Sequence, residues 1–358
     1  IFLVDSKYAE SDTQKISLIK DEYDTTAGLD NENFIKKVIE LGGKVLVAKS
    51  YLAAKDYLKD RNQFDVKFLL AKQGESSTTD DGTISDFSQA IEIAKYRRDC
   101  AVVYTKILST DGTLKYEDEE KKLLKLVEAD SSTDSNDDYE DEKNIPGKYV
   151  LPFYAKNLKV DNKEIDAGKA YILAYLNSIK TNPEWLSIAG SKRGLIPGDK
   201  NKIKVDFMTE SEIDDMQPDG KTPDTIAINP IVEMNPWGIR IWGNRTAYVS
   251  QKDDKGLVAS SFANIRILLC DLKKRLYKAA RKYQFEQNVD ILWVNFQAEI
   301  NSLLEEMVHS YGIAGYRWFR EKTKDRAKIA ARLQIIPVEA IEDFDLTIEL
   351  TDSLTVNE

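Results

Sequence analysis

Residues Phe262 to Tyr316 read FANIRILLCDLKKRLYKAARKYQFEQNVDILWVNFQAEINSLLEEMVHSYGIAGY. Apolar residues recur here at three- and four-residue spacing, which predicts two helices, from about Phe262 to Tyr283 and from about Asp290 to Tyr311. The expected buried stripes consist of Ile265, Leu268, Leu269, Leu272, Leu276, Ala279, Ala280 and Tyr283 in the first helix, and of Leu292, Phe296, Ile300, Leu303, Met307 and Tyr311 in the second. The short FEQN connection predicts an antiparallel pair.

The chain before this pair alternates between helical and strand patterns. Helical spacing occurs at 34–43, 51–60 and 86–99, and strand-like runs occur at 44–48, 66–71 and 100–107. This order predicts an α/β (α+β) fold with parallel strand pairing. A nucleotide-binding loop would place glycines after the first strand, but the segment following Lys44 to Ala48 contains none, so no cofactor is expected.

An acidic segment separates the two halves of the chain. It carries eight acidic residues and no Lys or Arg between Glu128 and Glu142, which leaves −2 of the net −10 for the remainder. We predict a solvated acidic loop at 128–143 that ends an N-terminal α/β domain (1–145) and precedes a C-terminal domain (146–358). Asp134, Asn136 and Asp138 have the opening spacing of a calcium loop. Tyr139 and Ile145, however, occupy the positions of its glycine and closing glutamate, so no metal site is expected.

Composition narrows the classes of function. A length of 358 residues favours two or three domains, and no apolar run approaches the roughly 18 residues of a membrane span. His309 is the only histidine, which disfavours histidine-dependent catalysis, and no catalytic residue is expected. Two cysteines suit a reducing compartment. The start at Ile1 rather than Met suggests an N-terminally truncated fragment.

The loop GSKRGLIPG (Gly190 to Gly198) is the main argument for an enzyme. It resembles a phosphate-binding loop in composition, but its lysine has the wrong spacing and no strand-to-helix context surrounds it. An α/β enzyme acting on a phosphorylated substrate is therefore kept as a remote alternative.

Two strand patterns occur near the end of the sequence. ARLQIIPV (Ala331 to Val338) is a strand candidate, and FDLTIELT (Phe344 to Thr351) alternates strictly between apolar and polar residues. Its apolar face consists of Phe344, Leu346, Ile348 and Leu350. Such a half-buried strand can pair within its own sheet or extend the open edge of a neighbour, and the pattern alone leaves both possibilities open.

Three segments in this order resemble contractile tail sheath proteins of tailed (myovirus-type) bacteriophages. The first is INPIVEMNPWGIRIWGNRTAY (Ile228 to Tyr248), with its turn Trp242, Gly243, Asn244, Arg245 and Thr246. The second is the helix pair with FEQN and a following G-x-x-G, and the third is QIIPVEAIEDFDLTIEL (Gln334 to Leu350). The resemblance extends over roughly residues 145–358.

The resemblance implies a structural subunit rather than an enzyme. Sheath subunits polymerise around a tail tube in a metastable extended state and contract by rigid-body rearrangement, which drives the tube through the host envelope. The C-terminal domain would face inward and carry a long antiparallel helix pair on a mixed sheet, with the N-terminal domain outward. Residues 344–358 would form a terminal arm that completes a sheet in an adjacent subunit, and a matching N-terminal arm would lie before Ile1.

The resemblance also implies partners and a location. These partners are further copies of the chain, the tail tube protein, and baseplate and tail terminator proteins, within a virion tail assembled in the host cytoplasm. Neither nucleic acid nor a membrane is an expected partner. Candidate tube-facing residues, which the basic composition of this segment suggests, are Arg320, Lys322, Lys324, Arg326 and Lys328. A sheath from a phage-derived bacteriocin or another contractile injection system would share the same motifs.

Overall fold

A computed structural model provides the structure of the chain. The residues it describes are 1–5, 17–19, 31–72, 86–105, 123, 127, 146–250, 256–321 and 329–340.

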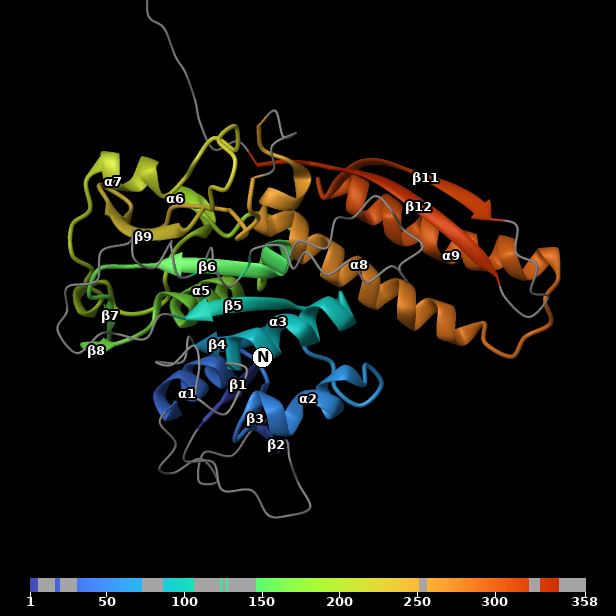
Figure 1. The fold of residues 1–358 in the computed structure, drawn as a ribbon, viewed down its shortest axis with the longest axis horizontal. Helices are drawn as coiled ribbons and strands as arrows, with labels where there is room; N and C mark the ends of the chain where they lie inside the picture. Colours follow the sequence, from blue (N-terminus) through green and yellow to red (C-terminus); the bar gives the residue numbers. More distant parts are fainter. Residues whose placement is uncertain are drawn as a thin grey trace, which may run out of the picture.

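An eight-stranded mixed sheet forms the centre of the fold (Figure 1), with strand order β10-β9-β6-β5-β4-β1-β3-β2. The strands are β1 (Phe2–Val4), β2 (Ser17–Ile19), β3 (Val45–Ala48), β4 (Phe68–Lys72), β5 (Ala101–Thr105), β6 (Val150–Tyr154), β9 (Asn229–Met234) and β10 (Gly238–Ile241). The six inner strands pair in parallel, whereas β2 and β10 pair antiparallel at the two borders. Parallel strands need covered faces on both sides, and helices supply that cover.

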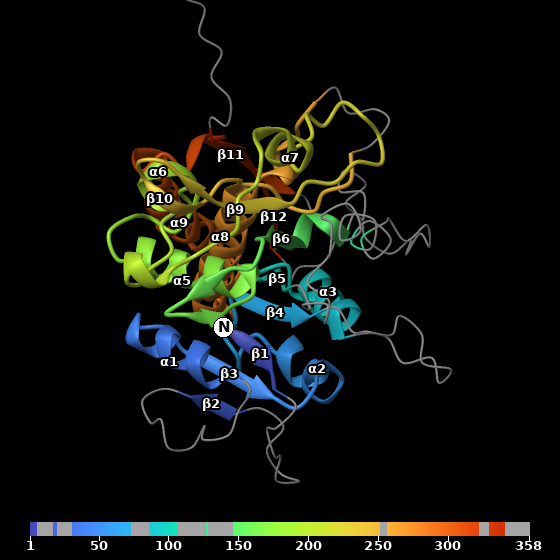
Figure 2. The ribbon, with the colours of Figure 1, turned by 90° about the vertical axis from the view of Figure 1, so that its left-hand side faces the viewer.

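Helices lie on both faces of the sheet, as Figure 2 shows. The helices α1 (Glu32–Glu40) and α5 (Ala167–Ser178) cover one face, and α2 (Tyr51–Lys59) and α3 (Asp86–Arg97) cover the other. Side chains of β3 alternate accordingly, with Val45 and Val47 in the first layer and Leu46 and Ala48 in the second. The Ser50 side chain caps α2 by accepting a hydrogen bond from the Ala53 amide at 3.1 Å.

Two long helices and a hairpin extend beyond the sheet (Figure 1). This helix–hairpin unit comprises α8 (Ala263–Lys282), α9 (Asp290–His309), β11 (Ile313–Glu321) and β12 (Ala330–Pro337). The start of α8 packs under the sheet through Ala263 and Ile267, and the rest of α8 runs antiparallel to α9. A separate core joins helices and hairpin, formed by Trp185, Leu268, Leu272, Ala279, Ile300, Leu304, Met307 and Ile313.

Short elements connect these parts. They are η2 (Pro146–Tyr149), β7 (Lys159–Val160), β8 (Lys163–Glu164), α6 (Gly190–Arg193), η3 (Lys200–Lys202), α7 (Glu210–Asp215) and η4 (Ala259–Ser261). Within the described ranges, no helix has both the length and the apolar character that crossing a bilayer requires.

The predicted fold class is confirmed, including the parallel pairing and both long helices. The sheet continues across the expected domain boundary, because β5 pairs with β6 through Val103 and Leu151. The predicted division into two domains at 145/146 stays a prediction, and the central sheet does not end there. The acidic loop at 128–143 and the alternating strand at 344–351 lie outside the described residues.

Candidate assembly site

The turn Trp242–Thr246 joins the sheet to the helix–hairpin unit. The Trp242 amide donates to the Pro230 carbonyl at 2.8 Å, which continues the pairing with β9. Two residues later, Asn244 accepts from the Ala263 amide through its carbonyl at 2.8 Å, at the first residue of α8. The turn is thus bonded at one end to the sheet and at the other to the helix.

Two buried asparagines bind this turn tightly. The Asn229 side chain donates to the carbonyls of Pro152 and Arg245, at 2.8 and 2.7 Å, and accepts from the Arg245 amide at 2.7 Å. The Asn244 side chain donates to Asn264 Oδ1 at 2.7 Å. Because buried amides are costly when unpaired, these bonds specify one geometry for the junction.

Glycine is required within the turn by its neighbours. A Cβ on Gly243 would lie 2.6 Å from Gln217 Nε2 and 2.7 Å from Asn229 Oδ1, closer than any van der Waals contact allows. Arg245 is only 5% exposed and lies over the Phe262 ring, 5.3 Å from its centre. The residues predicted from the family motif therefore form an internal joint of the molecule and present little surface to a partner.

Aromatic side chains hold the helices to the hairpin. Trp293 and Trp318 pack edge to face with ring centres 6.0 Å apart, and Trp318 Nε1 donates to Asn301 Oδ1 at 2.8 Å. Trp185 donates to the Ser310 carbonyl at 3.2 Å and leaves no room for a side chain at Gly312, the first glycine of the G-x-x-G. One face of the hairpin is thereby fixed against α9.

The hairpin also has outer edges that no described strand covers. In the part of the chain that the structure describes, β11 and β12 pair only with each other, from Glu321↔Ala330 to Ile313↔Pro337. Each strand therefore has one outer edge without a partner strand among the described residues. Ile336 on β12 is 65% exposed. An uncovered strand edge is a template for pairing with another chain.

Only part of the predicted contact surface falls within the described residues. Arg320, in β11, donates to Asp290 at 2.9 Å and lies over Trp293. The other candidate tube-facing residues, Lys322, Lys324, Arg326 and Lys328, lie outside the described residues. The same holds for the candidate arm residues Phe344, Leu346, Ile348 and Leu350.

Polar contacts of Asn62 and Asp65 join the loop after α2 to α8, and no sequence pattern predicts them. We call these contacts the brace. Asp65, in the loop after α2, forms ion pairs with Lys274 and Lys278, the latter at 3.3 Å. Asn62 accepts from the Tyr277 hydroxyl at 3.2 Å. Burial raises the pKa of Asp65, but the hydrogen bonds and positive charges of the two lysines outweigh it and hold that pKa below the ordinary value.

The loop that carries the brace is itself fixed by a buried arginine. Arg97 donates to the carbonyls of Leu58 and Phe64, at 2.6 and 3.0 Å, and pairs with Asp99 at 2.8 Å. Asp65 lies in a segment of mixed polar and apolar residues, RNQFDVKF (Arg61 to Phe68), so no local pattern could have identified a partner 209 positions away.

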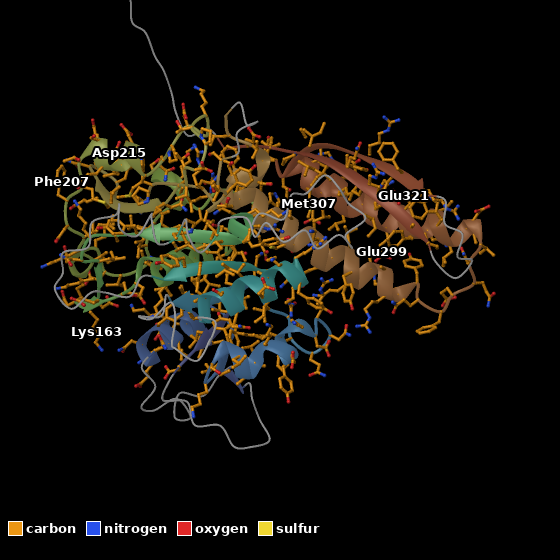
Figure 3. The ribbon with its side chains drawn as sticks, in the orientation of Figure 1. Lys163, Phe207, Asp215, Glu299, Met307 and Glu321 are labelled. Atoms are coloured by element: carbon orange, nitrogen blue, oxygen red, sulfur yellow. The ribbon has the colours of Figure 1, made fainter. Side chains whose placement is uncertain are left out.

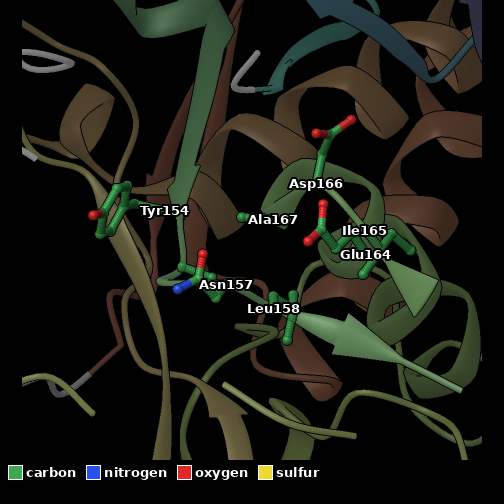
Figure 4. A pocket seen from close by; sticks show the side chains of 8 residues that line it. Tyr154, Asn157, Leu158, Glu164, Ile165, Asp166 and Ala167 are labelled. Carbon is green, nitrogen blue, oxygen red and sulfur yellow. The ribbon is translucent and has the colours of Figure 1, made fainter. Parts of the chain in front are cut away.

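Features of an enzyme site are sparse in the described ranges. A small hollow between β6 and α5 is lined by Tyr154, Ala155, Asn157, Leu158, Glu164, Ile165, Asp166 and Ala167 (Figure 4). This lining contains no histidine, cysteine, serine or lysine, and Asp166 is paired with Lys169 at 2.9 Å. No group of three or more His, Cys, Asp or Glu side chains among the described residues could hold a metal ion. His309 is exposed at the end of α9.

Comparison with curated proteins finds a relative among phage tail proteins. The chain is 28% identical over 217 residues to the tail sheath protein of Vibrio phage KVP40, an alignment covering 58% of this chain and 30% of that protein. The chain thus spans about a third of the length of the curated relative it matches. No family model matches the sequence.

Solved structures share the fold over nearly the whole chain. A chain of the contracted PVC sheath complex, from an extracellular contractile injection system, matches with a TM-score of 0.65 at 17% identity, covering 98% of this chain and 91% of that one. A chain of the anti-feeding prophage baseplate matches with a TM-score of 0.64 at 14% identity, covering 98% and 92%. In sequence over more than half of its length, and in fold over almost all of it, this chain resembles contractile tail sheath proteins.

Proposed function

We propose that the chain is a structural subunit of a contractile phage tail sheath. In this proposal, copies polymerise around a tail tube in a metastable extended state. They then contract by rigid-body movement and drive the tube through the host envelope. The sequence relative and the shared fold support this reading. The proposed role is structural and involves no catalysis.

The observation that carries the proposal is the β11–β12 hairpin, whose two outer edges have no partner strand among the described residues. Both of these edges offer backbone donors and acceptors to a strand of another chain. The sequence that follows β12 contains the predicted strand Phe344 to Leu350, which alternates between apolar and polar residues. When this terminal arm (344–358) pairs with the hairpin of an adjacent copy, directional hydrogen bonds link the subunits while leaving them free to swing.

The proposal includes an arrangement of parts and partners. Residues 146–358 face the tube and residues 1–145, with the acidic loop, face outward. The basic residues from Arg320 to Lys328 provide weak, orienting contacts with the tube protein, since exposed ion pairs contribute little each. Baseplate and terminator proteins bind the ends of the polymer. The tail is assembled in the host cytoplasm and functions in the virion.

Contraction needs no nucleotide in this scheme. The extended lattice is a long-lived state, and contraction releases the difference in contact free energy between two packings of the same rigid bodies. The braced junction between sheet and helix–hairpin unit favours movement of the subunit as one body, because Asn229, Asn244 and Asp65 each bond across it.

A second candidate is the sheath of a bacteriocin or other contractile injection system. Its support is specific, because two solved structures of similar fold belong to the PVC and anti-feeding prophage particles. Both candidates share the same subunit mechanism and differ in the particle that the sheath drives.

The test is negative-stain electron microscopy of the full-length protein, with and without tube protein. We expect striated cylinders whose length follows the tube when tube is present. Discrete particles that hydrolyse a nucleotide or a phosphorylated substrate would contradict the proposal and favour the α/β enzyme.

A further inference from the structure

The outer face of the β11–β12 hairpin carries two exposed arginines beside one phenyl ring. Alternate side chains of a strand point to opposite sides, so Trp318 packs on the inner core while its neighbours Arg317 and Phe319 point outward. Phe319 pairs across the strands with Arg332, and Arg317 is the diagonal neighbour of Arg332 on the same face. The Arg317 guanidinium lies over the Phe319 ring, 5.0 Å from its centre. Both guanidinium groups are therefore accessible to a partner.

These two arginines have hydrogen-bond donors to spare. Among the described residues, Arg317 forms no ion pair with a carboxylate. Arg332 donates through Nε and Nη2 to a single oxygen of Glu321, at 3.1 and 3.0 Å, and keeps its other donors. A guanidinium can bind a carboxylate with two hydrogen bonds, and side chains of diagonal neighbours lie about 7–8 Å apart. The face thus fits two carboxylates at about that separation.

The acidic segment at 128–142 has a matching arrangement of charges. It contains eight acidic residues and no Lys or Arg, and its end places Asp138, Glu140 and Glu142 at alternate positions. Alternate side chains of an extended chain point to the same side and lie about 7 Å apart. Two of these carboxylates therefore match the spacing of Arg317 and Arg332, an agreement more specific than that of overall charge.

The length and the ends of this segment allow it to reach another subunit. Val127 before it and Pro146 after it are buried, so residues 128–145 are tethered to the sheet layers at both ends. An extended chain spans about 3.3 Å per residue, so such a loop can reach about 30 Å from its ends. This reach is about the length of α9 and extends to a neighbouring copy in contact with the subunit.

We propose that the acidic segment of one subunit binds the outer face of the β11–β12 hairpin in an adjacent copy. Asp138 and Glu140 then lie on Arg317 and Arg332. This inference rests on the proposed polymerisation, which brings an adjacent copy to the edges of the same hairpin, and it adds a contact separate from the terminal arm. Because the charges on both sides are solvated, the contact is weak and falls off with salt.

The first test measures binding of a fluorescent peptide of residues 128–142 to the full-length chain by anisotropy, at protein concentrations below those of self-association. Arg317→Gln should weaken binding about three- to tenfold, as for loss of one charged hydrogen-bonded contact. Glu321→Gln frees Arg332 and should strengthen binding about two- to fivefold, a gain that misfolding cannot produce. Lys200→Gln removes the same charge at an exposed site and should bind like the wild type.

Two altered peptides separate spacing from charge. Replacing Asp138, Glu140 and Glu142 by their amides should weaken binding more than replacing the acids at 128, 130 and 134, although each change removes three charges. In the full-length chain, deletion of 128–142 should raise the protein concentration needed for self-association about three- to tenfold, measured by sedimentation velocity.

Several results would overturn this inference. Equal binding by wild type and Arg317→Gln, equal losses with the two altered peptides, or unchanged self-association after the deletion would each do so. Loss of binding in Lys324→Gln but not in Arg317→Gln would assign the peptide to the connection between β11 and β12. Peptide binding that appears only after deletion of 128–142 would place the segment on the hairpin of its own chain. The absence of self-association in the wild type, with peptide binding intact, would instead overturn the proposed function and, with it, an adjacent copy as the source of the segment.

Discussion

The sheet layers and the helix–hairpin unit of this chain differ in how completely they bury their surfaces. Six strands of the sheet are paired on both sides, helices cover both faces, and residues such as Phe2, Val45 and Leu69 have no exposed surface. The hairpin is covered on one face, and in the described residues each of its strands has one partner. The faces of the sheet are thus covered by helices of the same chain, whereas the hairpin has the edges to which, in the proposed assembly, another chain adds a strand.

The two long helices also differ in the residues that they expose: α8 exposes basic side chains, and α9 exposes apolar ones as well. α8 has a basic outer face, with residues such as Lys278 and Lys282 exposed. α9 is apolar on its inner side at Trp293 and Ile300, and also exposes Ile291 and Val294, at 62% and 54%. A helix that is apolar on several sides is normally buried. Figure 3, which labels Glu299, Met307 and Glu321 here and Phe207 at the opposite end, helps to locate this region.

The largest expected effect comes from removing the strand that would complete the hairpin. We expect a chain lacking residues 344–358 to fold through the three described cores, which residues from Phe2 to Ile313 form, but to form no ordered polymer. Circular dichroism and thermal melting report folding, and electron microscopy reports assembly. Undiminished polymerisation of this truncated chain would refute the role of the terminal arm.

A substitution pair sharpens the same experiment. Ile348→Asp places a charge on the apolar face of the alternating strand and should abolish assembly, whereas Thr347→Asp, on the polar face, should permit it. If both variants assemble equally well, the alternation has no role in pairing.

The next largest effect is expected when a large side chain in the core of the sheet layers is replaced by alanine. Phe68 is 1% exposed and packs edge to face on Tyr175, with ring centres 4.8 Å apart. Phe68→Ala should lower the free energy of unfolding by about 3–5 kcal/mol, because it leaves a cavity in a closed core. Phe285→Ala, at the fully exposed tip of the helix pair, should change it by less than about 0.5 kcal/mol. Urea denaturation measures both, and equal losses would contradict the proposed contrast in burial.

Much of the fold could be predicted because its patterns are local. The strand at β3 and the helices α1, α2 and α3 begin and end within a few residues of their expected bounds. Tyr311, however, was wrongly included in the buried stripe of α9. The helix ends at His309, the backbone of Tyr311 turns to a φ of 59°, and its side chain becomes 75% exposed. Ala280 of α8 was likewise included in a buried stripe and is exposed.

The contacts inside the candidate assembly site could not be predicted, because they join residues far apart in the sequence and spacing does not encode them. The WGNRT segment was found by resemblance, but its role as a joint follows from bonds to Asn229 and Asn264. The order of strands in the sheet also could not be read from alternation, which predicts the faces of a strand but not its neighbours.

A smaller effect is expected at the brace that joins the two parts. Asp65→Asn removes the ion pairs with Lys274 and Lys278 and should destabilise the outer half of α8 by about 0.5–1 kcal/mol, because Asp65 is largely exposed. Amide hydrogen exchange from Lys274 to Lys282 should become roughly two to five times faster, with β4 and β5 unchanged. Asp56→Asn, an exposed acid on α2, is the control. Unchanged exchange in α8 would show that the brace contributes nothing to joining the two parts.

The smallest effect is a pH dependence of the same contact. The pKa of Asp65 is held below its ordinary value of 3.8 in the folded chain, so ionised Asp65 contributes stability that is fully present above pH 3.8. That contribution is lost as the pH falls through the lower, folded pKa. Asp65→Asn cannot titrate, so its stability deficit relative to wild type should be constant from pH 7 to about pH 5 and shrink below pH 4. Urea denaturation at a series of pH values measures the difference, and 0.5 M salt should reduce it at neutral pH because the lysines are partly solvated. A deficit that persists unchanged at pH 3 would mean that Asp65 acts by shape rather than by charge, and that the junction between the two parts is held by packing alone.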